Sequence, residues 1–254
     1  MKLNVTVCEL PDDRESFDGC WTDLQRYIET ESSDIVVLNE APFDKWFAQS
    51  SEYVESVWNT AVDRHTTAIA DLEFGCSVIA TAPINQNGRR HNQAFSWDAT
   101  TGYAPWRRKA FLPDEESVYE ATWYQAAPDQ PDVRTIAEVS VGVLTCTEIW
   151  QLEWASRMGQ LGAQVIATPR ATGSSSLDKW FAAGRVAAIC SGAYSVSSNR
   201  VSSVFGGGGW IFSPDGDLLA RTDRENPFAT ATINLEVADE AKSTYPRYAL
   251  WART

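Results

Sequence analysis

The chain has 254 residues, of which 44% are hydrophobic and 22% are charged, proportions typical of a globular domain. Its formal net charge of -13 argues against nucleic acid and anionic membranes as partners, because both are bound by basic surfaces. No apolar run approaches the roughly 18 residues of a membrane span, and the first residues alternate like a strand rather than forming a signal peptide. We therefore expect a cytoplasmic protein.

The five cysteines are spread along the chain without a Cys-x-x-Cys pair, at positions 8, 20, 76, 146 and 190. An odd number at such spacing fits neither a disulfide framework nor a zinc site, and it indicates a reducing compartment in which thiols stay free. The only two histidines are His65, expected on a polar helix face, and His91, expected in a hairpin. With so few ligands, the sequence predicts no metal centre, and no motif indicates a cofactor.

The first half of the chain alternates between strand and helix patterns. Residues 2–8 predict a strand, residues 16–31 have the spacing of an amphipathic helix, and residues 34–38 form a short apolar strand of the kind that is covered on both faces. A second helix and the two strands of a hairpin follow, over residues 50–71, 77–82 and 92–98. Residues 127–133 then read as a Pro/Asp loop.

The second half begins with a strand over residues 139–144 that stops at Cys146, after which residues 148–161 predict a helix. A strand, a helix and four further strands follow in order, over residues 164–168, 177–189, 194–198, 210–212, 218–220 and 229–233. Four glycines at 206–209 lack the Gly-Lys-Ser/Thr of a phosphate loop, so we expect them to allow flexibility or close backbone packing near a pocket rim. Strands that alternate with helices predict an α/β fold in a single domain, residues 1–254.

Three chemically capable residues lie at the ends of apolar segments: Glu40, Lys109 and Cys146. Each has a structural explanation too, because a carboxylate can pair with a surface lysine, a basic run is usually solvated, and a cysteine can pack as a small hydrophobe. Taken together, they form a set for acyl transfer through a thioester. The carboxylate can remove the thiol proton, and the lysine, with the backbone N–H of Thr147, can stabilise an oxyanion. The dipole of the predicted helix after Cys146 favours the thiolate.

The segments around these residues resemble the three signature segments of the nitrilase, or carbon–nitrogen hydrolase, superfamily. They read Val-Val-Leu-Asn-Glu40-Ala-Pro-Phe43, Arg-Lys109-Ala-Phe-Leu-Pro and Gly-Val-Leu-Thr-Cys146-Thr-Glu-Ile-Trp, and their order and separations fit the family. The resemblance implies a four-layer α-β-β-α sandwich that usually pairs into a homodimer or a higher homo-oligomer. It also implies chemistry without a metal or a cofactor, and we expect residues 238–254 to form a tail that packs on a partner subunit.

The resemblance also implies a role for each residue: Glu40 as general base and later acid, Lys109 as oxyanion stabiliser, and Cys146 as nucleophile. Many members have a second glutamate between the lysine and the cysteine, which positions the lysine and the attacking water. The candidates here are Glu115, Glu116 and Glu120. The context Tyr-Glu-Ala-Thr-Trp favours Glu120, and we expect the other two to be solvated.

Departures from the better-known branches of the family leave the substrate open; they lie at Asn39, Thr147-Glu148 and Pro169-Arg170. The amidase-like branch predicts hydrolysis of an amide or N-carbamoyl group in a small molecule. A nitrile is the alternative substrate, because Glu148 resembles the nitrile-hydrolysing branch. A different class of function is a non-catalytic binding or assembly protein on the same scaffold.

Four residues are candidate substrate contacts: Phe43, Glu148, Trp150 and Arg170. Phe43 and Trp150 can line an apolar acyl pocket, although most of the eleven tryptophans are expected in the core. Arg170 can hold a substrate carboxylate by a bidentate contact, or it can pair with a local acidic residue.

Overall fold

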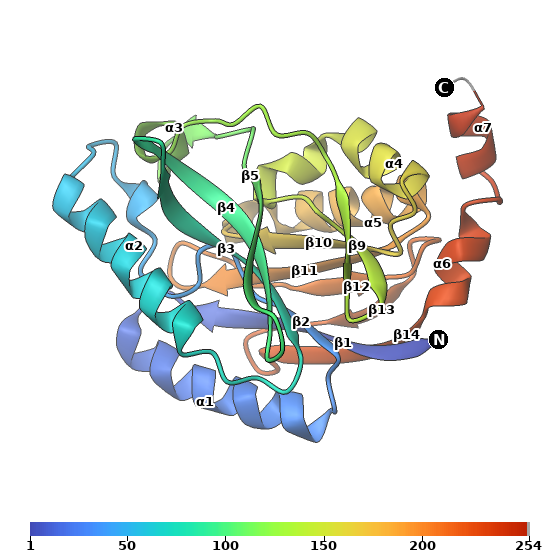
Figure 1. Cartoon of the computed structure of the whole chain (residues 1–254), viewed down its shortest axis with the longest axis horizontal. Coiled ribbons are helices and arrows are strands. Elements are labelled where there is room, and N and C mark those ends of the chain that lie inside the picture. Colours follow the sequence, from blue (N-terminus) through green and yellow to red (C-terminus); the bar gives the residue numbers. More distant parts are fainter. Residues whose placement is uncertain (253–254) are drawn as a thin grey trace.

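Most strands of the computed structural model, which describes residues 1–252, join into one curled sheet (Figure 1). The strands are β1 Lys2–Pro11, β2 Ile35–Val37, β3 Ser77–Gln86, β4 Arg89–Asp98, β5 Gly102–Arg108, β6 Asp114–Glu115, β7 Val118–Tyr119, β8 Val133–Ile136, β9 Val139–Val143, β10 Val165–Arg170, β11 Tyr194–Val201, β12 Trp210–Phe212, β13 Leu218–Arg221 and β14 Phe228–Asn234. The α-helices are α1 Arg14–Thr30, α2 Glu55–Ala70, α3 Glu120–Trp123, α4 Leu152–Gln160, α5 Leu177–Ser191, α6 Leu235–Ala241 and α7 Arg247–Trp251. Short 3-10 helices are η1 Phe47–Gln49, η2 Cys146–Trp150 and η3 Ser174–Ser176.

The sheet runs in the order β5-β4-β3-β2-β1-β11-β10-β9-β8, and it folds back on itself so that two halves face each other. The halves join where β1 and β11 pair in parallel, with Glu9 opposite Asn199. The central strands β2, β1, β11, β10 and β9 are parallel to their neighbours in this order, and β14 and β12 add antiparallel pairs to β1 and β11. Because parallel strands end at the same edge of a sheet, the chain segments that leave them meet there.

Three apolar clusters define four layers. Val5 and Val37 of one half meet Val141 and Val196 of the other between the two halves of the sheet. Helices α1 and α2 cover the outer face of the first half, and α4 and α5 cover the outer face of the second (Figure 1). The predicted α-β-β-α sandwich is confirmed, because each sheet half buries one face against the other half and one against helices.

The structure corrects several predicted elements. The helix predicted over residues 148–161 is two elements, η2 and α4, separated at Gln151. The second helix begins at Glu55 rather than near residue 50, and the Pro/Asp loop leads directly into a strand, β8. His65 does not lie on a polar helix face: the residue is 1% exposed, because α2 turns it towards the sheet.

The predicted tail contains α7 and the end of α6, and its last two residues, 253 and 254, lie outside the described part of the chain. Arg247 anchors α7 to its own subunit through the backbone oxygen of Ala241 and through Asp215. Tyr245 and Tyr248, in contrast, point outwards and are 73% and 59% exposed. Within residues 1–252, no helix combines the length and apolar character that crossing a membrane requires.

Candidate active site

The ends of three strands bring Glu40, Lys109 and Cys146 together. Glu40 follows β2, Lys109 follows β5, and Cys146 follows β9 as the first residue of η2. Their side chains are almost fully buried, with exposed fractions of 0%, 1% and 3% for the whole residues. The first two come from one half of the sheet and the third from the other half, so the folding back of the sheet creates the site.

Lys109 lies between two carboxylates. Its Nζ donates to Glu40 Oε1 at 2.8 Å and to both oxygens of Glu120, at 2.8 and 2.7 Å. Burial alone would lower the pKa of Lys109, but the negative charges of Glu120 and Glu40 outweigh burial and hold this pKa well above its usual value. The lysine is therefore a fixed cation. Burial also raises the pKa of Glu120, and the positive charge of Lys109 opposes that shift.

Of the three candidate second glutamates, the structure brings only Glu120 to Lys109. Glu115 and Glu116 are exposed on and beside the short β6–β7 hairpin, as expected. Glu120 is fully buried at the start of α3, and the next residue, Ala121, donates its N–H to the backbone oxygen of Pro113 in the chain after β5. The hairpin and the one-turn helix thus separate solvated carboxylates from the buried one.

The two oxygens of Glu40 have different neighbours. Oε1 accepts hydrogen bonds from Lys109 and from Asn92 Nδ2, the latter at 2.7 Å. Oε2 is buried and has no hydrogen-bond partner among residues 1–252. Two donors therefore fix the carboxylate through one oxygen and leave the other able to exchange a proton.

Cys146 has a strained backbone and a neutral thiol. Its φ of 50° lies in the left-handed region, which costs energy for a residue with a side chain and often occurs at functional sites. Burial, together with the charge of Glu40, raises the pKa of the thiol. Our expectation that a helix dipole favours the thiolate was wrong for the free protein, because η2 is only a short 3-10 helix and desolvation dominates. The backbone N–H of Ala171 faces the sulfur.

The first turn of η2 also contains Thr147. A backbone N–H in the first turn of a helix has no acceptor within that helix, so it is available to a developing oxyanion. The residues that line a cavity of about 500 Å³ include both Thr147 and Tyr124. The cavity therefore reaches the residue after the thiol.

A family model described as carbon-nitrogen hydrolase matches residues 20–243, which is most of the chain. The chain belongs to the carbon–nitrogen hydrolase family. No curated protein matches its sequence.

Solved structures share the fold of this carbon–nitrogen hydrolase at low sequence identity. A carbon-nitrogen hydrolase from Helicobacter pylori G27 is similar with a TM-score of 0.87 and 20% identity, covering 98% of this chain and 95% of that one. An amidase from Nesterenkonia sp. gives 0.77 and 15%, covering 99% and 95%. Nit3 from Saccharomyces cerevisiae, a member of branch 10 of the nitrilase superfamily, gives 0.75 and 16%, covering 96% and 94%.

In this carbon–nitrogen hydrolase, Glu148 is not free to contact a substrate as predicted. Its carboxylate forms a buried ion pair with Arg107 and accepts the backbone N–H groups of Ala110 and Thr145, at 2.8 and 2.9 Å. The same bonds explain the tight 3-10 turn after Cys146, because Thr145 and Glu148 form a capping box. Glu148 therefore links the turn that begins at Cys146 to the segment that contains Lys109.

Arg170 is near Cys146, and its hydrogen bonds within residues 1–252 all go to neutral oxygens. Its guanidinium donates to Ser197 Oγ, Thr172 Oγ1 and the backbone oxygen of Gly208, at 2.7, 2.8 and 2.6 Å. Burial lowers the pKa of this guanidinium to about 9. A Cβ on Gly206 would lie 2.5 Å from the backbone Cα of Ser174, so the glycine run allows close backbone packing, one of the two predicted alternatives.

Phe43 and Trp150, the other two predicted contacts, lie apart from each other. Phe43 packs against Phe17 and Trp21 of α1, on the helix side of the sheet, and its backbone N–H donates to His65. Trp150 is 45% exposed and its ring lies 5.2 Å from that of Trp180. The structure therefore does not place Phe43 and Trp150 in one apolar pocket.

Two residues that our sequence-based assignment missed support the site. Asn92, on β4, binds Glu40 directly, and Arg200, on β11, donates through Nε to the backbone oxygen of Glu40 at 3.0 Å. Arg200 also binds the backbone oxygen of Ala41, whose φ of 44° is strained. Both residues lie in polar stretches of strands, His91-Asn92-Gln93 in β4 and Ser198-Asn199-Arg200 in β11, and these stretches were the available signal.

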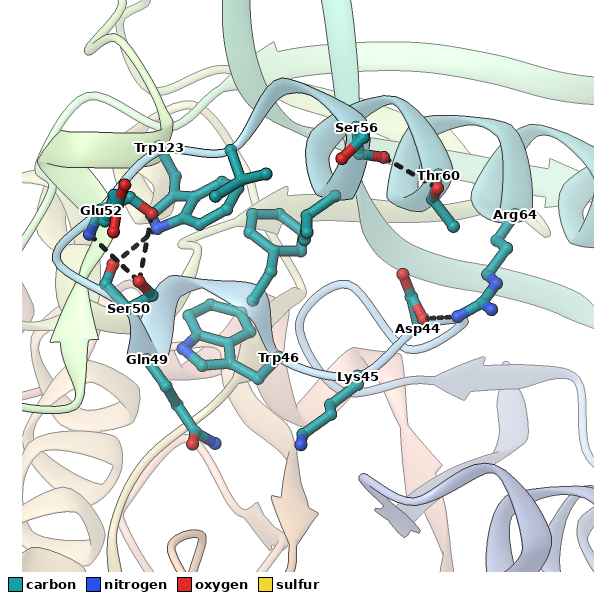
Figure 2. A pocket seen from close by; sticks show the side chains of 13 residues that line it. Asp44, Lys45, Trp46, Gln49, Ser50, Glu52, Ser56, Thr60, Arg64 and Trp123 are labelled. Atoms are coloured by element: carbon teal, nitrogen blue, oxygen red, sulfur yellow. Dashed lines mark hydrogen bonds and ion pairs between the residues drawn. The ribbon is translucent and has the colours of Figure 1, made fainter.

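A second cavity of about 540 Å³ lies between η1 and the start of α2 (Figure 2). Its lining includes Trp46, Phe47 and Trp123, which belong to the same buried aromatic cluster as Tyr124 and Ala171. The aromatic cluster therefore extends from this cavity to the neighbours of Glu120 and Cys146.

Proposed function

We propose that the protein hydrolyses a non-peptide C–N bond in a small molecule, an amide or an N-carbamoyl group, with Cys146 as nucleophile. One observation carries the proposal. Glu40, Lys109 and Glu120 form a continuous, buried hydrogen-bonded chain beside a buried cysteine with a strained backbone. Membership of the carbon–nitrogen hydrolase family supports the same reaction class.

Acylation begins with Glu40. Because the pKa of the Cys146 thiol is raised, the thiol needs a base at the moment of attack, and the unpartnered Oε2 of Glu40 can accept its proton. The sulfur attacks the carbonyl carbon, and the oxyanion is stabilised by Lys109 and by the Thr147 N–H. Protonated Glu40 then gives its proton to the leaving nitrogen. Ammonia or an amine departs, and a thioester remains.

Deacylation reverses the roles of the same groups. Glu40 takes a proton from water, the water oxygen attacks the thioester carbon, and the acid is released as the sulfur regains its proton. Glu120 keeps Lys109 in place through two hydrogen bonds during both steps. No step requires a metal or a cofactor.

The test is release of ammonia or amine from parallel panels of amides, N-carbamoyl compounds and nitriles. Turnover of amides or carbamoyl compounds supports the proposal, whereas turnover of nitriles alone indicates the alternative, nitrile hydrolysis. C146A is expected to reduce kcat at least about a thousandfold. The matched control is C190A, which removes a half-buried thiol on α5 and is expected to keep full activity. Full turnover by C146A would show that Cys146 is not the nucleophile, whereas no turnover of any panel by the wild type would support a binding or assembly role.

The proposal includes a homodimer or higher homo-oligomer in which residues 238–254 pack on a partner subunit. The exposed rings of Tyr245 and Tyr248 support it, because large aromatic side chains are enriched at protein interfaces. Light scattering coupled to size-exclusion chromatography tests it: Y245S/Y248S is expected to shift the protein towards monomer. The free cysteines favour a reducing compartment such as the cytoplasm.

A further inference from the structure

Tyr124 is held rigidly beside the proposed site. It follows the last residue of α3 and lies one turn after Glu120, whose backbone oxygen accepts its N–H at 2.8 Å. Its ring packs against Phe47 and Trp58, with centroids 5.6 and 5.5 Å away. The preceding Trp123 donates from Nε1 to the backbone oxygen of Ser50 at 2.7 Å (Figure 2). The position of the Tyr124 hydroxyl is therefore determined by packing.

The hydroxyl itself has no hydrogen-bond partner in the part of the chain from 1 to 252, although Tyr124 is only 1% exposed. An unpaired buried hydroxyl destabilises a fold, and buried tyrosines normally avoid this. Tyr194 is the comparison within this chain: it is 4% exposed, and its hydroxyl donates to the backbone oxygen of Asn234 at 3.0 Å. Tyr124 therefore has a polar group that the fold does not use.

The charged neighbours of this hydroxyl are those of the site. Burial, followed by the negative charges of Glu120 and Glu40, raises the pKa of Tyr124 well above its usual value, so the phenol stays neutral. Glu40 Oε2 and Asn92 Oδ1 are also buried without a partner among the described residues. Tyr124 also lines the same cavity as Thr147, the residue directly after Cys146.

We propose that Tyr124 is a catalytic residue whose hydroxyl binds the leaving nitrogen of the substrate and then the attacking water, opposite Glu40 Oε2. This inference rests on the proposed function and names its substrate class. The groups around the leaving nitrogen are Glu40, Lys109, Glu120 and Tyr124, all at most 1% exposed. A position enclosed by four buried residues fits an unsubstituted –NH2 and disfavours an N-alkyl group. The proposed substrates are therefore primary amides or terminal carbamoyl groups.

The proton transfers balance as follows. In the tetrahedral intermediate, Glu40 donates the proton that it took from the thiol to the nitrogen, while an N–H of that nitrogen donates to Tyr124 Oη. The C–N bond breaks and ammonia leaves. Water then takes the position of ammonia, with one O–H directed to Glu40 Oε2 and the other to Tyr124 Oη. Its oxygen attacks the thioester carbon, the C–S bond breaks, and Glu40 returns the proton to sulfur.

The experiment compares Y124F with Y194F, two changes that each remove one buried hydroxyl. Y124F is expected to lower kcat on short aliphatic primary amides at least about tenfold, while Tm stays the same or rises, because the lost hydroxyl made no bond in the free protein. Intact-protein mass spectrometry after acid quench is expected to show accumulated acyl-enzyme. Y194F is expected to lower Tm and to keep kcat within about twofold.

Three results would overturn the inference: a kcat for Y124F within about twofold of the wild type, a fall in Tm for Y124F as large as that for Y194F, or equal turnover of N-methyl amides and primary amides. The failure of the proposed function looks different. In that case the wild-type protein hydrolyses no amide or carbamoyl compound, or C146A retains its turnover. If the wild type turns over amides and Y124F has the same kcat, only the role of Tyr124 is refuted, and the proposed function stands.

Discussion

At the level of single residues, the two oxygens of Glu40 have different surroundings, and this difference matters most for the proposed chemistry. A carboxylate that must take a proton from sulfur and later give it to nitrogen needs one oxygen held and the other unoccupied. Lys109 and Asn92 both bind Oε1, at 2.8 and 2.7 Å. We infer that Asn92 is a positioning residue for Glu40, since its amide binds Oε1 and leaves Oε2 unoccupied.

Replacing Asn92 by alanine tests this role. A hydrogen bond to a charged group contributes about 1.5–3 kcal/mol, so N92A is expected to lower kcat about 10- to 100-fold, with a smaller change in KM. N226A is the control, because Asn226 lies in an exposed turn and its side chain bonds only to Asp223 among the described residues. An unchanged kcat for N92A would contradict the positioning role. The variant's circular dichroism is expected to match that of the wild type.

Among the structural elements, the strands before Glu40 and Cys146 were predictable, since hydrophobic patterns act over neighbouring residues. The 3-10 turn after Cys146 was not, because it depends on the ion pair of Glu148 with Arg107, which is 41 residues away in the chain. The burial of His65 was missed for a similar reason. Its partner is the backbone of Phe43, on the loop after Glu40. Long-range polar pairs of this kind leave no periodic pattern in the sequence.

The contact of α2 with the loop after Glu40 predicts a pH dependence of stability. His65 Nε2 accepts from the Phe43 N–H, and burial lowers the pKa of His65 from 6.5 to about 4. Its contribution is present above pH 6.5, where neither state is protonated, and is lost as pH falls from 6.5 towards 4, because the unfolded state binds a proton first. We expect a loss of about 2 kcal/mol in unfolding free energy between pH 7 and 5 from this group.

Urea unfolding of the wild type and H65Q at both pH values measures this contribution. The glutamine oxygen can accept the same N–H but does not titrate, so the fall between pH 7 and pH 5 is expected to be smaller by about 2 kcal/mol in the variant. Equal falls in the two proteins would show that His65 does not carry the effect.

For the whole molecule, the site depends on how the two halves of the sheet fold back. Glu40 and Lys109 come from the first half, Cys146 comes from the second, and Glu120 lies in the connection between β5 and β8. Arg200 of β11 joins the halves at this point, because it binds Asp12 and the backbone oxygens of Glu40 and Ala41. The resemblance to a family predicted from the sequence which residues form the site. The contacts of Arg200 that join the two halves are seen only in the three-dimensional structure.

The outer layers predict a contrast between two helical glycines. A Cβ on Gly159 of α4 would lie 2.2 Å from the backbone oxygen of Ser191 at the end of α5, whereas a Cβ on Gly19 of α1 would meet nothing within 4 Å. We expect G159A to lower the unfolding free energy by about 2–3 kcal/mol, because backbone must move to relieve the overlap. G19A is expected to raise it by about 0.5–1 kcal/mol, since alanine loses less conformational entropy in a helix. Denaturant titration of both variants measures the contrast, and a stable G159A would mean that α4 and α5 do not approach as closely in solution.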